Sequence, residues 1–101
     1  MTRYDDAVER LRSAVLSGPG ALDRGLREAA YGAEELPGAL GHYVAKVRLR
    51  AHEVSGEDID AVRADRRSDD EIFEATVCAA LGAGLTRLER GMSALEASRG
   101  S

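Results

Sequence analysis

Few side chains in this sequence could take part in chemistry, and its cysteine and two histidines come first among them. Cys78 is the single cysteine, which excludes both an intrachain disulfide and a redox thiol pair. His42 and His52 lie ten residues apart, so on one helix their side chains would point about 80° apart. Metal-binding histidines on a helix are usually three or four residues apart. We therefore expect neither a metal site nor a bound cofactor.

His52, Glu53 and Glu74 are the candidate residues for acid–base catalysis. The adjacent His52 and Glu53 could act as a general base and its partner; alternatively, His52 interacts with the free carbonyl groups at a helix end. Glu74 interrupts an apolar segment, so its carboxylate must be paired, hydrogen-bonded or protonated. An acid–base role for Glu74 competes with a salt bridge to an arginine, for which the candidates are Arg48, Arg50 and Arg87.

Cys78 lies in the same apolar segment, about three turns into the helix that starts at Ser68. A reactive thiol needs partial exposure and a lowered pKa, typically near a cation or a helix start. Free cysteines are also among the residues most often buried in proteins. We therefore expect Cys78 to be a buried, unreactive thiol.

The apolar segment that holds both residues is predicted to be the central, buried C-terminal helix of the fold. Ser68 and Glu71 have the spacing of a capping box, in which each side chain accepts an N–H group at a helix start. Residues 72–85 are apolar and small apart from two polar positions, and a helix that is apolar on every side is typically buried. Gly82 and Gly84 each destabilise a helix by about 1 kcal/mol relative to alanine. They indicate close contact with another helix or, alternatively, a small-ligand cavity.

Helical spacing recurs along the rest of the chain, without the alternation that strands show. The sequence predicts an all-α, single-domain bundle of about five helices over residues 1–101, near residues 4–16, 21–31, 37–51, 55–64 and 68–95. Aromatic residues make up only 4% of the chain, so the core must consist of alanine, leucine and valine. Because such a core buries little area, we expect a homo-oligomer. The helix face that we expect to contact another copy carries Leu85, Leu88, Met92 and Leu95.

The net charge of −4 and the lack of a basic cluster argue against nucleic-acid binding. Residues 55–62, a short turn and the helix from Ser68 do match a helix-turn-helix in length. In such modules the start of the second helix approaches DNA, and Asp69, Asp70 and Glu71 would be repelled there. The first residues hold no signal-peptide apolar run, and no stretch is long enough to span a membrane. We therefore expect a cytoplasmic protein that binds neither nucleic acid nor membranes.

Three phrases in the second half of the chain carry a resemblance to a known family. They are residues 43–47, residues 54–63, and residues 68–74 followed by Ala79, Ala80 and Arg87. Through them, residues 43–95 resemble the second half of the carboxymuconolactone decarboxylase and alkylhydroperoxidase D-like family. The resemblance implies an all-helical fold and assembly as trimers or hexamers. Redox-active members use a Cys-x-x-Cys pair, a histidine and a nearby glutamate, and the pair is missing from this sequence.

The function we expect is therefore that of an oligomeric helical protein of this kind without the thiol pair, which binds a small molecule or serves as a structural subunit. One alternative is a family-type enzyme, with acid–base chemistry or a weak peroxidase-like activity resting on Cys78. The other is the helix-turn-helix module. Whether His52 and Glu74 converge on one pocket distinguishes the acid–base enzyme from the binding or structural protein.

Overall fold

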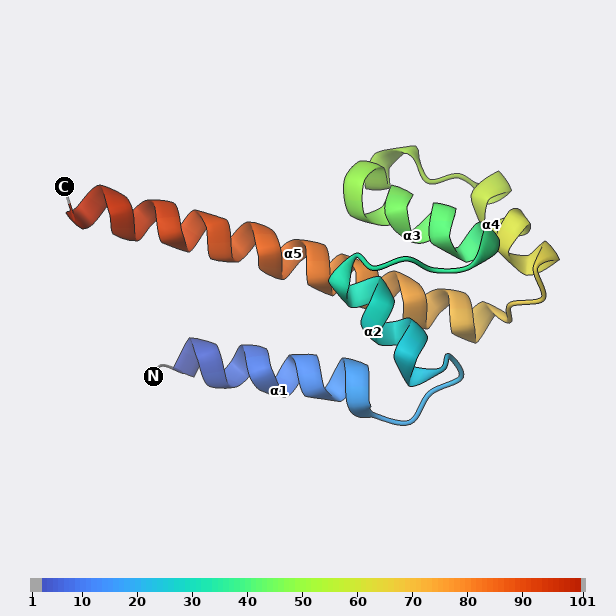
Figure 1. Ribbon diagram of the computed structural model, residues 1–101, viewed down its shortest axis with the longest axis horizontal. Coiled ribbons are helices and arrows are strands. Elements are labelled where there is room, and N and C mark those ends of the chain that lie inside the picture. Colours follow the sequence, from blue (N-terminus) through green and yellow to red (C-terminus); the bar gives the residue numbers. More distant parts are fainter. Residues whose placement is uncertain (1–2, 101) are drawn as a thin grey trace.

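The computed structural model describes residues 3–100, which form helices and their connections (Figure 1). The predicted all-α bundle of five helices is confirmed, and no β-strand occurs within this range. Besides the short 3-10 turn η1 (Ala51–Glu53), the elements are α1 (Arg3–Ser17), α2 (Arg24–Gly32), α3 (Gly38–Arg50), α4 (Gly56–Ala64) and α5 (Asp69–Gly100). Figure 1 shows α3 and α4 on one side of the first half of α5, with α1 on the opposite side.

Capping boxes start both α4 and α5, and the one at Ser68 and Glu71 is as predicted. The N–H of Ser68 donates to Glu71 Oε1 at 3.0 Å, and the N–H of Glu71 donates to Ser68 Oγ at 3.1 Å. At the start of α4, the N–H of Ser55 donates to Asp58 Oδ2 at 2.8 Å. These side chains satisfy N–H groups that have no partner within the helix, so α4 and α5 begin where the sequence predicts.

The capping carboxylate of Glu71 makes the stability of the fold depend on pH. Its hydrogen bond from the Ser68 backbone and its contact with Arg67 hold the pKa of Glu71 below the ordinary value. A lowered folded-state pKa stabilises the fold above the unfolded-state pKa, and this contribution is lost as the pH falls through the lowered value. Glu71→Gln, which keeps the cap but not the charge, should lose less than about 1 kcal/mol near neutral pH and nothing near pH 2.

Urea unfolding at several pH values measures this difference. Asp70→Asn is the control, because Asp70 is an exposed carboxylate in the same turn with no hydrogen bond in the described part of the chain. A Glu71→Gln protein whose stability changes with pH as steeply as that of the wild type would contradict the assignment.

The core lies around the first half of α5, which packs against α2 and α3. As predicted, it consists mainly of alanine, leucine and valine. Tyr43 is its one buried aromatic side chain among the described residues, and its hydroxyl pairs with Thr76 Oγ1 at 2.6 Å. The buried cluster comprises Leu16, Leu22, Ala30, Leu36, Leu40, Tyr43, Val44, Val62, Ile72, Ala75, Cys78 and Ala79.

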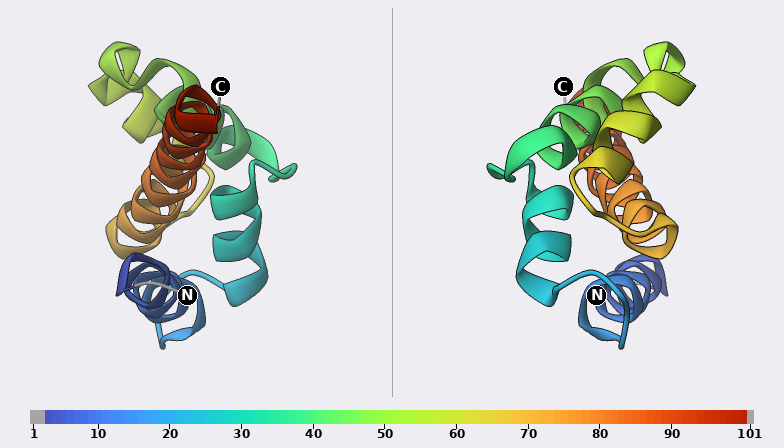
Figure 2. Two further views of the ribbon diagram at one scale, coloured as in Figure 1. Left: turned by 90° about the vertical axis from the view of Figure 1, so that its left-hand side faces the viewer. Right: turned by 90° about the vertical axis from the view of Figure 1, so that its right-hand side faces the viewer.

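The second half of α5 leaves the body of the protein. Residues 86–100 are all exposed, and they project on the same side as the N-terminal end of α1 (Figure 1). The end-on views in Figure 2 show that the outer ends of these two helices lie apart. The radius of gyration is 15.3 Å, whereas a compact chain of this length has about 13 Å.

No helix in residues 3–100 has the length and apolarity that crossing a bilayer requires.

The prediction that residues 72–85 are buried on every side is wrong. Ile72, Ala75 and Ala79 face the core, but Phe73 is 69% exposed, and Ala80 and Gly84 are exposed as well. The segment is apolar all round because it has two apolar faces, and only one of them packs within the chain. The core prediction therefore holds for one face of the helix, and the other face remains uncovered.

Candidate functional site

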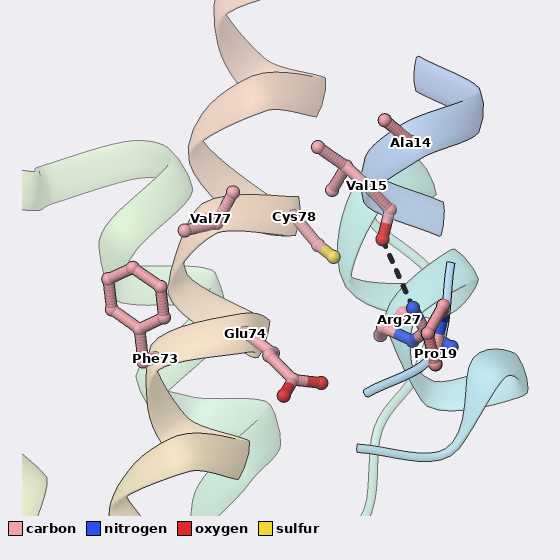
Figure 3. A pocket seen from close by; sticks show the side chains of 8 residues that line it. All are labelled: Ala14, Val15, Pro19, Arg27, Phe73, Glu74, Val77 and Cys78. Atoms are coloured by element: carbon pink, nitrogen blue, oxygen red, sulfur yellow. Dashed lines mark hydrogen bonds between the residues drawn. The ribbon is translucent and has the colours of Figure 1, made fainter. Parts of the chain in front are cut away.

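A cavity of about 200 Å³ lies between α1, α2 and α5, and it gathers the charged and thiol side chains nearest the core (Figure 3). Arg27 comes from α2, whereas Glu74 and Cys78 come from successive turns of α5. The remaining wall is apolar. The lining residues are Ala14, Val15, Pro19, Arg27, Phe73, Glu74, Val77 and Cys78.

Arg27 is the buried cation of this cavity, with only 7% of its surface exposed. Its Nη1 donates to the carbonyl oxygens of Val15 at 3.2 Å and Gly18 at 2.6 Å, so it caps the end of α1. Its Nε is buried without a hydrogen-bond partner, and its Nη2 has no acceptor in residues 3–100. Within the same residues, no carboxylate forms an ion pair with Arg27.

Glu74 binds the connection between α1 and α2. Its Oε2 accepts the N–H of Ala21 at 2.8 Å, and its Oε1 accepts the N–H of Leu22 at 2.9 Å. A Cβ atom at Gly20 would overlap Glu74 Oε1, so this approach requires glycine. α2 begins at Arg24 rather than at Ala21 because Asp23 caps it: Asp23 Oδ2 accepts the N–H of Gly25 at 2.9 Å.

None of the three arginines predicted as partners of Glu74 binds it. Arg50 lies 4.0 Å from Glu53, and Arg87 Nη2 donates to the carbonyl oxygen of Arg48 at 2.9 Å. Arg48 Nη1 lies between α2 and α5 and donates to the carbonyl oxygens of Ala30, Tyr31 and Ala79. The predicted need for hydrogen bonding at Glu74 is thus met by backbone amides.

Cys78 is buried, with 1% of its surface exposed, as the sequence predicts. Burial raises the pKa of its thiol; the charge of Arg27 opposes this effect and that of Glu74 adds to it. The thiol is therefore protonated at neutral pH, which is the opposite of what a nucleophilic cysteine needs.

His52 and Glu53 lie on η1, outside the cavity that holds Glu74. His52 Nε2 is 3.5 Å from Glu53 Oε2, and the His52 side chain is 81% exposed. The structure thus pairs these two residues but does not bring the three acid–base candidates into one cavity. His42 is also exposed, beside Glu34 and Glu35 in an open hollow. The described residues hold no cluster of three potential metal ligands.

Searches against family models, curated proteins and solved structures found no match to this chain. The resemblance of residues 43–95 to the carboxymuconolactone decarboxylase and alkylhydroperoxidase D-like family therefore stays a prediction.

Sequence reasoning missed Arg27. The only signal for it was its position beside Leu26 and Ala30 on the apolar face of α2, where long basic side chains often reach out to solvent instead.

Proposed function

We propose that the protein is a homo-oligomeric helical subunit in which the uncovered apolar face of α5 binds another copy. The observation that carries this proposal is the α5 stripe, a set of apolar or small residues spaced three and four apart along α5. Of its larger side chains, Phe73 is 69% exposed, and Leu88, Met92 and Leu95 are 42–44% exposed. The stripe consists of Phe73, Val77, Ala80, Leu81, Gly84, Leu88, Gly91, Met92 and Leu95.

The length of the stripe supports a protein interface. From residue 73 to residue 95 it extends over about 33 Å of helix. Contiguous exposed apolar surfaces of this kind mark interaction sites, whereas single exposed apolar residues do not. Outside the stripe, Leu11 on α1 is a further large apolar side chain that is 49% exposed. Leu85, predicted as part of this face, is instead buried within the chain.

The glycines of α5 fall into two groups: one that the packing of the chain itself requires, and one that it does not. At Gly82 an added Cβ would overlap the carbonyl oxygen of Tyr31, so the chain itself requires glycine there. At Gly84 and Gly91 an added Cβ would meet nothing within 4 Å. Each of these two glycines costs the helix about 1 kcal/mol relative to alanine without any benefit inside the chain. Close approach of another helix would account for both of them.

The pattern of side-chain sizes favours a second copy as the partner. The midpoint between Gly84 and Gly91 falls between residues 87 and 88, so two antiparallel copies crossing there would bring Gly84 of one beside Gly91 of the other. The same register would set Leu95 of one copy against Ala80 of the other, a large side chain against a small one. Such a surface is complementary to itself, which is the requirement for a two-fold symmetric interface.

Leu88→Glu tests this proposal. A charge buried at the centre of the interface should weaken association by more than about tenfold, because an unpaired buried charge is strongly unfavourable. Light scattering coupled to size-exclusion chromatography should give a multiple of the 10.8 kDa chain mass for the wild type and the chain mass for the variant.

Ser93→Glu is the matched control. It adds the same charge to the same exposed half of α5, about 140° around the helix from Leu88. It should assemble as the wild type does. A wild-type protein that is strictly monomeric at micromolar concentration, or equal dissociation by the two substitutions, would refute the α5 stripe as a self-association surface.

The family relationship and a cytoplasmic location belong to the same proposal. The family resemblance rests on the phrases within residues 43–95, and the location rests on the single, buried thiol of Cys78. DNA binding gains no support, because the first turn of α5 is acidic. Its Asp69 pairs with Arg63 at 2.8 Å, and its Glu71 pairs with Arg67 at 3.1 Å.

A further inference from the structure

The guanidinium group of Arg27 has one satisfied nitrogen and one unpaired edge. Nη1 makes both of its hydrogen bonds, to the end of α1, whereas Nε and Nη2 have no acceptor in the described residues. Nε is buried, so Nη2 is the nitrogen of this edge at which a carboxylate can form a charge-assisted hydrogen bond. A buried cation without a counter-charge is unfavourable, so an anionic partner would stabilise this arrangement.

Arg27 is the cavity-lining side chain that keeps hydrogen-bond donors without acceptors. Both oxygens of Glu74 already accept backbone N–H groups, and the Cys78 thiol is buried. Figure 3 shows Glu74 and Cys78 directed toward the side of the cavity where Arg27 lies. Because Glu74 is itself negative, a ligand with one negative charge fits better than one with two.

The size and walls of the cavity limit the rest of the ligand. Ala14, Val15 and Val77 provide apolar surface, and the volume is about 200 Å³. An apolar cavity of about 150 Å³ can hold a benzene molecule. We propose that this cavity binds a small monocarboxylate with an apolar body of roughly benzoate size, and that Arg27 recognises its carboxylate.

Benzoate and its neutral analogue benzamide are the probes for this proposal. Titration of the full-length protein, followed by amide chemical-shift changes, should show benzoate binding at least about tenfold more tightly than benzamide. Arg27→Met should reduce the affinity for benzoate to that for benzamide. Arg24→Met is the matched control on the same helix, because Arg24 is exposed and pairs with Glu28, and it should leave the affinity unchanged.

Because Arg27 also caps α1, a second variant keeps that residue intact. Ala14→Phe fills the cavity from an exposed position on α1 and should abolish benzoate binding. Benzoate should also slow alkylation of Cys78, the single thiol of the chain, in the wild type and not in Ala14→Phe. Equal affinities for benzoate and benzamide, or full binding by Ala14→Phe, would overturn the assignment.

The cavity and the α5 stripe are tested independently. The same titration of Leu88→Glu, the variant designed to be monomeric, should give the wild-type affinity for benzoate. Loss of assembly with retained benzoate binding, or the reverse, separates a failure of one proposal from a failure of the other.

Discussion

Gly82→Ala should lower the free energy of unfolding by about 2 kcal/mol or more, although alanine is the better helix former. The added Cβ would overlap the carbonyl oxygen of Tyr31 and lie 2.7 Å from Arg48 Nη1. Arg48 Nη1 itself donates to the carbonyl oxygen of Tyr31 at 2.8 Å, so the new methyl group would strain the hydrogen bonds that join α2 to α5. Urea unfolding measures the effect.

Gly84→Ala is the matched control, one half-turn further along the same helix. Nothing lies within 4 Å of its added Cβ, so the chain should gain up to about 1 kcal/mol of stability. Both substitutions belong in the Leu88→Glu background, where self-association does not contribute. Equal stabilisation by the two alanines would show that α2 and α5 do not approach as closely as the structure has them. In the wild-type background, Gly84→Ala should weaken assembly while it stabilises the monomer.

Glu74→Ala should lower the free energy of unfolding by about 3 kcal/mol, because it removes two hydrogen bonds to a charged acceptor. The N–H groups of Ala21 and Leu22 would lose their partner, and the connection between α1 and α2 would separate from α5. Denaturant unfolding measures the loss. Alkylation of Cys78, which lies one turn from Glu74 and lines the same cavity, should become faster as this connection opens.

Asp70→Ala provides the comparison for Glu74, since it removes an exposed carboxylate from the same helix. It should change stability by less than about 0.5 kcal/mol and leave the alkylation of Cys78 unchanged. Glu74→Gln should fall between the wild type and Glu74→Ala, because its one carbonyl oxygen still accepts an N–H group. A Glu74→Ala protein as stable as the Asp70→Ala protein would show that Glu74 does not hold the connection.

Local patterns predict most helix boundaries of this protein, because caps act within a few residues. Ser68 with Glu71, and Ser55 with Asp58, mark their helix starts through contacts only three residues long. The start of α2 departs from its prediction because Asp23 caps the helix through the N–H of Gly25. The residues before this cap, Ala21 and Leu22, are instead bound through their N–H groups by Glu74, which is more than fifty residues away. A contact between such distant residues leaves no periodic signal in the sequence.

The candidate site was less predictable than the fold for the same reason. Glu74 was identified as an acid that needs a partner, but the partner is backbone, and backbone groups are present at every position. The position of Arg27 on the apolar face of α2 is a weak signal, because whether an arginine reaches solvent or turns inward depends on where α1 ends beside it. Cys78 was predicted correctly, since its placement deep in an apolar helix depends on local sequence alone.

The projecting half of α5 also determines how its amide hydrogens should exchange with solvent. Residues 72–85 carry the buried side chains of α5, so their amides should exchange mainly when the domain unfolds, whereas residues 86–100 can open by fraying from the free end. In the monomer, protection should therefore fall along a continuous helix with no break in its geometry. Raising the protein concentration should extend the protection toward residue 100 if copies pair along the α5 stripe. α5 is thus one continuous helix whose two halves differ in stability.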